Sequence, residues 1–369
     1  MVTNTASYSI KILDAYTGEE KGELNMDGVS EGVFKISSVV AVDGKIFASN
    51  AAAASNVFKI YRWDSDTSAP VVALELAANT HCSNAMGGQI TFTGELNGGR
   101  IWTSDQLTNN MIYFTVSDGE IDPTVNKLPL YKSDGSTAFN LGDGRGAASV
   151  VQDVNGNYYI SAKDAYPAIF NPSGVMIEQM KAAPCLSNSY GTGLGIIPFG
   201  SKRYAAVGTY LSSNMTSAFT FVNITDGLSA AETAIGTYPA AGMGNVANTQ
   251  RLQSVVWSTR EDNQVLDVWF ASAIQGLCYY TYNGVRQAEG VDEIEDASEA
   301  FRVISDGSTL AVVGVEAAQI CVYNASGMLV ARNAGEQVID TSFIPSGLYI
   351  IQVKDLSGRV YASKIALRK

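Results

Sequence analysis

Histidine is nearly absent from this 369-residue sequence, in which His81 is the only one. A metal centre built from several histidines is therefore excluded, and a Ser-His-Asp hydrolase or a histidine general base would have to use this single residue. His81 lies in the polar stretch 79–84, which lacks the strand-turn-helix pattern that surrounds a catalytic nucleophile. We expect a solvated loop histidine, and we predict neither a metal site nor a cofactor.

Cysteine is also scarce, and the four cysteines are widely separated without any C-x-x-C pair: Cys82, Cys185, Cys278 and Cys321. We expect small buried hydrophobic residues rather than a disulfide framework or a zinc site. The chain lacks a run of about 18 apolar residues, so no transmembrane segment is predicted. Its first residues lack the basic and apolar regions of a signal peptide, and for an exported protein we expect a trimmed or processed chain.

Charged residues are few, at 16% of the chain, and the net charge is −12. This balance argues against nucleic acid or an anionic membrane as a partner, because nothing offsets the repulsion of phosphate groups. Neutral polar side chains must cover the surface, as is common on exported proteins that meet sugars. The sequence contains 35 glycines and 9% aromatic residues, a composition that favours an all-β protein with many tight turns.

A repeat of about 50 residues runs through the first 290 residues, which is the length of a four-stranded propeller blade. Five segments share a Gly- or Ser-rich start, an apolar strand, a turn, a second strand ending in small polar residues, and an aromatic third strand. The predicted strands are 36–40, 45–49 and 58–63; 89–92, 100–104 and 111–114; 148–151, 157–161 and 168–170; 195–197, 203–207 and 219–222; and 254–257, 265–269 and 277–280. Most segments add a fourth strand, such as 71–74.

Small residues before each first strand are explained by radial packing, because innermost strands crowd around the axis of a propeller. The segment 9–14, with Thr17-Gly18 after it, resembles a third strand and its turn. It either closes the ring against the fifth repeat or belongs to a sixth blade, so five and six blades both remain open. Residues 1–288, which contain a D-A-x-T-G motif at 14–18, resemble uncharacterised surface propellers of Bacteroidetes. The acidic stretch 289–300 is predicted to be a linker.

The last part of the chain, 301–369, is a series of short strands with glycine at the turns, typical of a small antiparallel β-sandwich of the immunoglobulin-like kind. It contains I-x-V-Y-N-x-x-G from Ile320, P-S-G-L-Y-I-I-x-V from Pro345, and a basic end, Arg368-Lys369. These motifs closely resemble the C-terminal sorting domain (type A) of the type IX, or Por, secretion system of Bacteroidetes. The resemblance implies export to the cell surface or medium, with the secretion machinery as a partner. The P-N-P that usually opens such domains is replaced by F-R-V-I-S at 301–305.

Three sequence motifs have simpler structural explanations. The glycine clusters 142–146 and 191–195 resemble nucleotide-binding loops, but each leads into a predicted strand rather than a helix, so we do not expect a phosphate site. Asp153–Asn157 resembles a calcium loop, although a type I′ turn at Asn155-Gly156 explains it better. Asp64-Ser65-Asp66 is favoured as a surface turn over a cation site.

In a propeller, the connections from fourth to first strands and from second to third strands surround the same end of the channel. Amide, aromatic and isolated charged side chains there suit a polar ligand. We therefore predict a secreted or cell-surface binding or adhesion protein that recognises a glycan or a protein, with no assigned catalytic residue. The alternative is a carbohydrate-active enzyme, a hydrolase or lyase, using acidic residues or tyrosine at the channel mouth. The seven candidate ligand-binding residues are Asn84, Asp105, Arg145, Lys163, Tyr190, Tyr210 and Arg251.

Overall fold

The structure, a computed structural model, divides into two compact units, Met1–Gly284 and Val285–Lys369, which we call the N-terminal and C-terminal units. It describes residues 2–4, 8–30, 34–53, 56–142, 144–163, 165–182, 190–211, 216–244, 246, 252–260, 265–283, 301–305, 308–324 and 329–367. The predicted linker 289–300 lies outside these residues. No helix of the described chain is long and apolar enough to cross a membrane.

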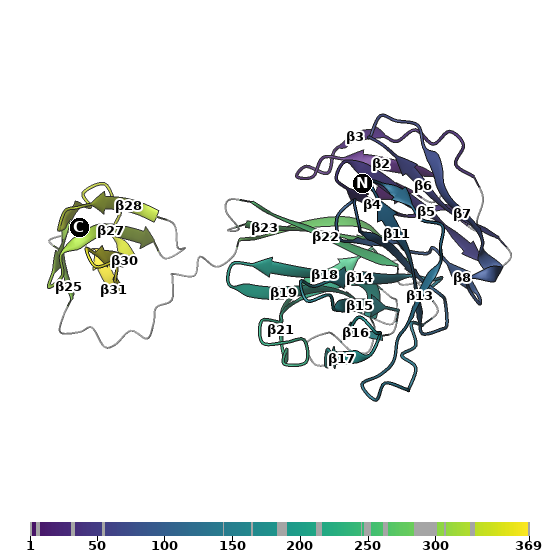
Figure 1. Ribbon diagram of the computed structural model, residues 1–369. Coiled ribbons are helices and arrows are strands. Elements are labelled where there is room, and N and C mark those ends of the chain that lie inside the picture. Colours follow the sequence, from purple (N-terminus) through teal and green to yellow (C-terminus); the bar gives the residue numbers. More distant parts are fainter. Residues whose placement is uncertain are drawn as a thin grey trace. The chain divides into compact units, whose positions relative to one another are not determined.

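The N-terminal unit is built from small antiparallel sheets that follow one another along the chain (Figure 1). The first sheet contains β4 (Phe34–Val42), β5 (Lys45–Ala53), β6 (Val57–Trp63) and β7 (Val71–Ala77), with β8 (Ala85–Met86) paired to β5. The second contains β9 (Thr91–Thr93), β10 (Arg100–Ser104) and β11 (Asn110–Ser117), with β12 (Glu120–Ile121) and β13 (Asn126–Pro129) both paired to β11. The third contains β14 (Ala148–Gln152), β15 (Tyr158–Ala162), β16 (Ala165–Phe170) and β17 (Met176–Gln179).

The fourth sheet contains β18 (Tyr190–Phe199), β19 (Lys202–Tyr210), β20 (Ser217–Asn223) and β21 (Ala234–Met243), and the fifth contains β22 (Gln253–Arg260), β23 (Val265–Ser272) and β24 (Gly276–Asn283). The strands β1 (Val2–Asn4), β2 (Ser9–Leu13) and β3 (Glu20–Glu23) form an N-terminal sheet that, among the described residues, shares no strand pairing with the other five. The predicted all-β class is confirmed, since strands, turns and one short 3₁₀ turn, η1 (Ala78–Thr80), make up the described chain.

Each sheet packs on the next through buried apolar side chains. Phe58 of the first sheet stacks on Phe114 of the second, with ring centroids 6.2 Å apart. Similar clusters join the second sheet to the third, the third to the fourth and the fourth to the fifth. Ile10 of the N-terminal sheet is fully buried together with Trp63 of the first. Alternating strand positions therefore supply apolar side chains to both faces of the inner sheets.

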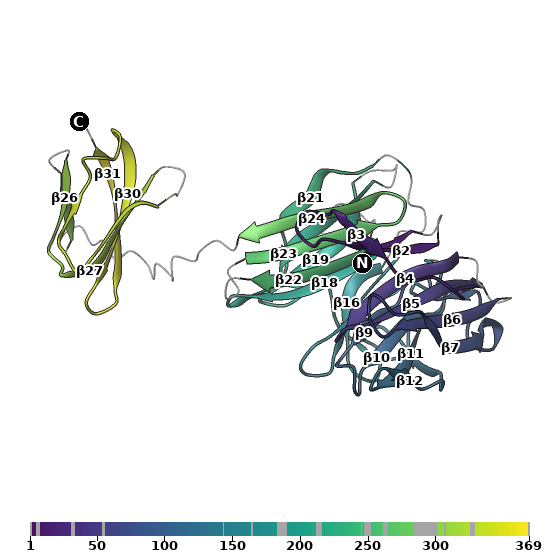
Figure 2. The ribbon, with the colours of Figure 1, turned by 90° about the horizontal axis from the view of Figure 1, so that it is seen from above.

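The N-terminal sheet also contacts the fifth sheet, so the series of contacts returns to its start. Trp269 Nε1 of β23 donates a hydrogen bond to Ala15 O, in the turn between β2 and β3, at 2.7 Å. The rings of Tyr16 and Tyr279 pack in an edge-to-face arrangement, with their centroids 6.4 Å apart. In Figure 2, β2 and β3 accordingly lie close to both β4 and β24.

Small hydroxyl side chains near the ends of second strands link successive sheets. Ser49 Oγ donates to Gly87 O at 3.1 Å, Thr103 Oγ1 to Gly146 O at 2.9 Å, and Ser161 Oγ to Gly191 O at 3.1 Å. Each donor lies on one sheet, and each acceptor lies either in the next sheet, as Gly191 does, or in the segment that leads into it. We call these bonds the inter-sheet hydroxyl contacts.

Close backbone approach explains glycine at two of these acceptors. Gly87 has φ +82°, and a Cβ there would lie 2.3 Å from Asn50 O. Gly146 has φ +70°, and a Cβ would lie 2.5 Å from Ser104 O. Neither position could hold a larger residue without moving backbone. The prediction that small residues are needed where neighbouring strands crowd agrees with this geometry.

In the C-terminal unit, two antiparallel sheets enclose a single core. One contains β25 (Arg302–Ser305), β26 (Thr309–Val313) and β29 (Val338–Asp340), and the other contains β28 (Leu329–Ala334), β27 (Ala317–Asn324), β30 (Gly347–Asp355) and β31 (Val360–Leu367). Leu310 and Ile339 from the first sheet are buried with Ile320, Ile351 and Val353 from the second. All of the core side chains belong to this unit.

The turn at Asn155-Gly156 differs from the prediction. A type I′ turn needs positive φ at both central residues, but only Gly156 has one, at +82°. Asp153 Oδ1 instead accepts the backbone N–H groups of Asn155 and Asn157 at 2.8 and 2.9 Å. The type I′ prediction is wrong because this carboxylate, rather than a left-handed Asn155, shapes the turn.

Candidate binding face

Two connections that the repeat predicts to share an end of the molecule are joined by hydrogen bonds. Ser83 N, in the segment between the first and second sheets, donates to Asp105 Oδ1 at 2.8 Å. Asn84 Nδ2 donates to Gln106 O at 3.3 Å. Asp105 and Gln106 begin the turn between β10 and β11. The segment that joins the first sheet to the second therefore lies beside the turn between two strands of the second sheet.

The next connections along the chain continue this surface. Leu107 N donates to Gly142 O at 2.8 Å, which joins the β10–β11 turn to the segment that leads into the third sheet. Gly142 in turn is packed against Lys163, in the β15–β16 turn, because a Cβ on Gly142 would lie 2.4 Å from Lys163 O. We call the surface formed by residues 81–88, 105–108, Gly142, 144–146 and Lys163 the loop face.

Arg145 lies at the inner side of the loop face. Its carbonyl oxygen accepts a hydrogen bond from Gly88 N at 3.0 Å, and its guanidinium lies over the Phe34 ring at 5.3 Å. Its φ is +57°, a left-handed conformation that is uncommon for an arginine. The side chain is half-buried, and its Nε is fully buried without a hydrogen-bond partner.

Two of the seven predicted residues have buried side chains. Asp105 is 2% exposed, and its carboxylate accepts hydrogen bonds from the Ser83 backbone N–H and hydroxyl. Tyr210 is also 2% exposed, and its burial raises its pKa. The Asp105 side chain supports the loop at Ser83, and neither side chain faces solvent. Loop polarity alone could not reveal this, because the groups that cover each side chain come from other segments.

The remaining predicted residues divide between exposed and undescribed positions. Asn84 is exposed, and Lys163 is half-buried beside Gly142. Tyr190 begins β18, but its side chain lies outside the described residues, and so does the whole of Arg251. The structure therefore brings Asn84 and Lys163 to the same loop face, with Asp105 buried beneath it.

His81 follows the 3₁₀ turn η1 and is half-buried. Burial, followed by the positive charge of Lys127, lowers the pKa of its imidazole, which favours the neutral form at pH 7. Among the described residues no group of three His, Cys, Asp or Glu side chains is arranged to hold a metal ion. The thiols of Cys82, Cys278 and Cys321 are unpaired, and Cys185 lies outside the described residues.

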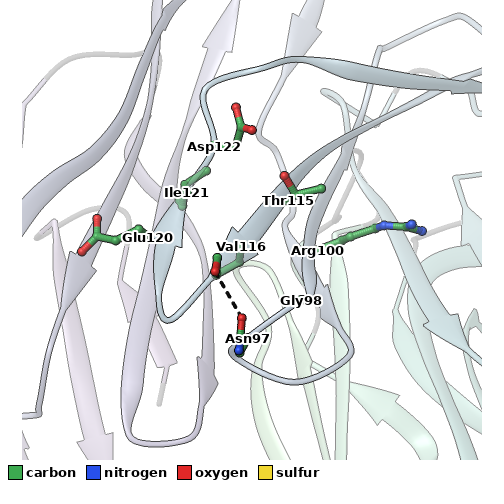
Figure 3. Close-up of a pocket in the computed structure, with 9 residues that line it drawn as sticks. Asn97, Gly98, Arg100, Thr115, Val116, Glu120, Ile121 and Asp122 are labelled. Carbon is green, nitrogen blue, oxygen red and sulfur yellow. Dashed lines mark hydrogen bonds between the residues drawn. The ribbon is translucent and has the colours of Figure 1, made fainter.

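A hollow of about 480 Å³ lies at the other end of the second sheet, between the β9–β10 and β11–β12 turns (Figure 3). Its lining residues are Asn97, Gly98, Arg100, Thr115, Val116, Ser117, Glu120, Ile121 and Asp122. The sequence repeat does not predict this hollow, because no sequence motif marks the division of the outer strand into β12 and β13.

Two charged side chains that line this hollow, Arg100 and Glu120, are engaged elsewhere. Arg100 points away from it in Figure 3, donates to the Tyr158 hydroxyl and lies over the Tyr113 ring at 5.0 Å. Glu120 pairs with Arg62 Nη1 at 2.6 Å. None of the seven predicted residues lines the hollow.

The geometry thus defines an all-β, propeller-like protein with a loop face fixed by hydrogen bonds between successive sheets. No protein-family model matches the chain, and no curated protein is similar to it in sequence. Among solved structures, a DUF4623 family protein from Bacteroides eggerthii is similar, with a TM-score of 0.59 and 17% identity over 72% of this chain and 62% of that one. This chain therefore spans less than two thirds of that protein, and the similarity shows the fold alone.

Two further structures are more distant. A thermostable family-43 glycoside hydrolase has a TM-score of 0.41 and 13% identity over 67% of this chain and 89% of that one. PorZ, a surface component of the type-IX secretion system of Porphyromonas gingivalis, has a TM-score of 0.29 and 10% identity over 90% of this chain and 59% of that one. At these TM-scores neither similarity carries an argument about this chain.

Proposed function

We propose that this protein is a secreted or cell-surface binding protein that holds a glycan or protein ligand on its loop face without chemically altering it. One observation carries this proposal: connections from successive sheets are bonded to one another, by Ser83 to Asp105 and by Leu107 to Gly142. A surface fixed in this way is preorganised, so a ligand loses less affinity to the ordering of loops. Exposed amide groups such as Asn84 then supply donors and acceptors for hydroxyl groups.

The hydrogen bonds that the buried Asp105 carboxylate already accepts favour binding over hydrolysis at this surface. Glycosidases need two carboxyl groups roughly 5–10 Å apart that can reach the sugar. Asp105 is buried, and its oxygens already accept hydrogen bonds from Ser83. Its role is to hold two loops together, so it does not supply a carboxylate to a ligand.

We propose that the scaffold is a six-bladed propeller in which the N-terminal sheet is the sixth blade. Its three strands form a sheet of their own, and it packs on the first sheet through Ile10 and Trp63. It also receives a hydrogen bond from Trp269 of the fifth sheet. These contacts on both sides support a closed ring with the loop face around one end.

We further propose that the C-terminal unit is an immunoglobulin-like sorting domain that engages a type IX secretion system. The resemblance of the Ile320 and Pro345 motifs supports this role, and the enclosure of one core by two sheets supports the domain type. The location at the outer surface or in the medium follows from this role.

A glycan array probed with purified full-length protein tests the binding proposal, followed by a reducing-end assay on each glycan retained. We expect retention without new reducing ends. New reducing ends from a retained glycan would instead establish the carbohydrate-active enzyme. Asn84→Ala should weaken retention, whereas Thr115→Ala, on the exposed surface of β11 beside the hollow, should leave it unchanged.

A further inference from the structure

Arg145 has a guanidinium without an ionic or hydrogen-bonding partner in the described chain. Among the described residues it lies over the Phe34 ring, 5.3 Å from the ring centroid, and its Nε is buried without an acceptor. Buried charged donors are normally paired, since removing them from water has a free-energy cost. An arginine in this state on a proposed binding face is available to an acceptor from outside the chain.

The backbone at this position adds an independent observation. Arg145 has φ +57°, and it is flanked by Gly144 and by Gly146 at +70°. Glycine would adopt the same conformation without strain, whereas a side chain there has a conformational cost of about 1–3 kcal/mol. A strained arginine between glycines indicates that the side chain itself is needed.

We propose that Arg145 is an anion-recognition residue and that the ligand of the loop face is an acidic polysaccharide bearing carboxylate groups, such as uronic acids. The planar guanidinium can bind both oxygens of a carboxylate, and the Phe34 ring fixes its orientation. This inference rests on the proposed function, because it names the chemical class of the glycan held on that face.

The overall charge of the protein limits the choice of anion. At a net charge of −12 the chain repels polyanions of any kind at long range, so an acidic polymer must be held by short-range contacts at the loop face. A single arginine suits a polymer that presents one carboxylate per sugar, together with hydroxyl groups that Asn84 and its neighbours can bind.

The test uses the full chain and two polymers with the same sugar backbone: polygalacturonate and its highly methyl-esterified form, in which the esters remove most of the carboxylate charge. Affinity gel electrophoresis and calorimetric titration should show retention of the acid polymer and a weaker interaction with the ester. Arg145→Gln should weaken binding of the acid polymer about 10- to 100-fold and leave ester binding unchanged. Arg203→Gln is the matched control, because Arg203 is exposed and donates to Tyr159 OH at 3.1 Å away from the loop face.

A second variant separates recognition from a structural role. Arg145→Gly should lose the same binding, while its melting temperature stays within about 2 °C of the original or rises, because strain is relieved. A fall of several degrees would show that Arg145 serves the fold and would overturn the inference.

The remaining outcomes are distinct from one another. Equal binding of acid polymer by the original protein and Arg145→Gln, or retention of neutral glycans only, overturns the inference but leaves the proposed function standing. Retention of a sulfated polymer in place of the uronate overturns the assignment of carboxylate. No retention of any glycan or protein ligand removes the inference and the proposed function together.

Discussion

At the scale of single residues, Asp267 shows how a buried charge is accommodated in a sheet. Its side chain on β23 is fully buried and accepts hydrogen bonds from Arg260 Nε at 2.8 Å, Tyr279 OH at 2.7 Å and Thr281 Oγ1 at 3.1 Å. Burial raises the pKa of its carboxyl, but these hydrogen bonds, with that from Arg260 foremost, outweigh burial and leave the pKa below its usual range.

We expect Asp267→Asn to lower the free energy of unfolding by about 2 kcal/mol at pH 7, because an amide cannot replace the charged acceptor of three donors. A folded-state pKa below the unfolded value of about 3.9 means that this stability is present above about pH 4 and is lost as the pH falls through the folded pKa. Urea denaturation at pH 7 and pH 3 should show a difference between variant and original that shrinks at the lower pH. A difference of equal size at both values would contradict the role of ionised Asp267; Asp66→Asn, on an exposed carboxylate, is the control.

The sequence alone predicts residue types at this scale better than it predicts their roles. The polar side chains of Asp105 and Tyr210 were expected around a channel mouth, and both are buried. Arg145 was one candidate among seven, and nothing in the G-D-G-R-G motif shows that its guanidinium lacks a partner. Burial and pairing depend on segments distant in the chain, and a local pattern contains no information about them.

At the scale of strands and sheets, period-two alternation and glycine turns predicted most elements. The predicted strand 100–104 coincides with β10, and 148–151 lies within β14. Small polar residues at the ends of second strands were also visible in the sequence. The reason for these residues was not visible, because the acceptor of each hydroxyl contact lies in or just before the next sheet, about 30 to 45 residues further along the chain.

Thr103→Val tests the inter-sheet hydroxyl contacts with a change of almost no volume. The buried Thr103 hydroxyl donates to Gly146 O and accepts from Gly87 N at 3.0 Å. We expect the free energy of unfolding to fall by about 2–3 kcal/mol, since two buried backbone groups lose their partner. Chemical denaturation provides the measurement, with Thr115→Val on the exposed face of β11 as a control that should change stability by less than about 0.5 kcal/mol. Equal effects of the two substitutions would show that the contacts contribute nothing.

At the scale of the whole molecule, the two units have separate cores. The apolar cluster of the C-terminal unit runs from Phe301 to Leu367 and contains no residue of the N-terminal unit. The N-terminal unit has its own series of clusters between successive sheets. Because each unit buries its apolar side chains internally, each satisfies the physical requirement for folding alone.

Deletion of residues 301–369 should therefore leave the N-terminal unit folded while it stops export. All four tryptophans, Trp63, Trp102, Trp257 and Trp269, lie before the deletion, so tryptophan fluorescence reports on the N-terminal unit in both proteins. We expect the denaturation curves of the full-length and shortened proteins to overlap within about 0.5 kcal/mol, because no core contact is removed. In the cells that naturally produce this protein, the shortened protein should remain inside the cell while the full-length protein reaches the surface or medium. Arrival of the shortened protein at the surface at the full level would disprove the sorting role. A large loss of stability would show that the N-terminal unit depends on the C-terminal one, and the export result could then not be assigned to sorting.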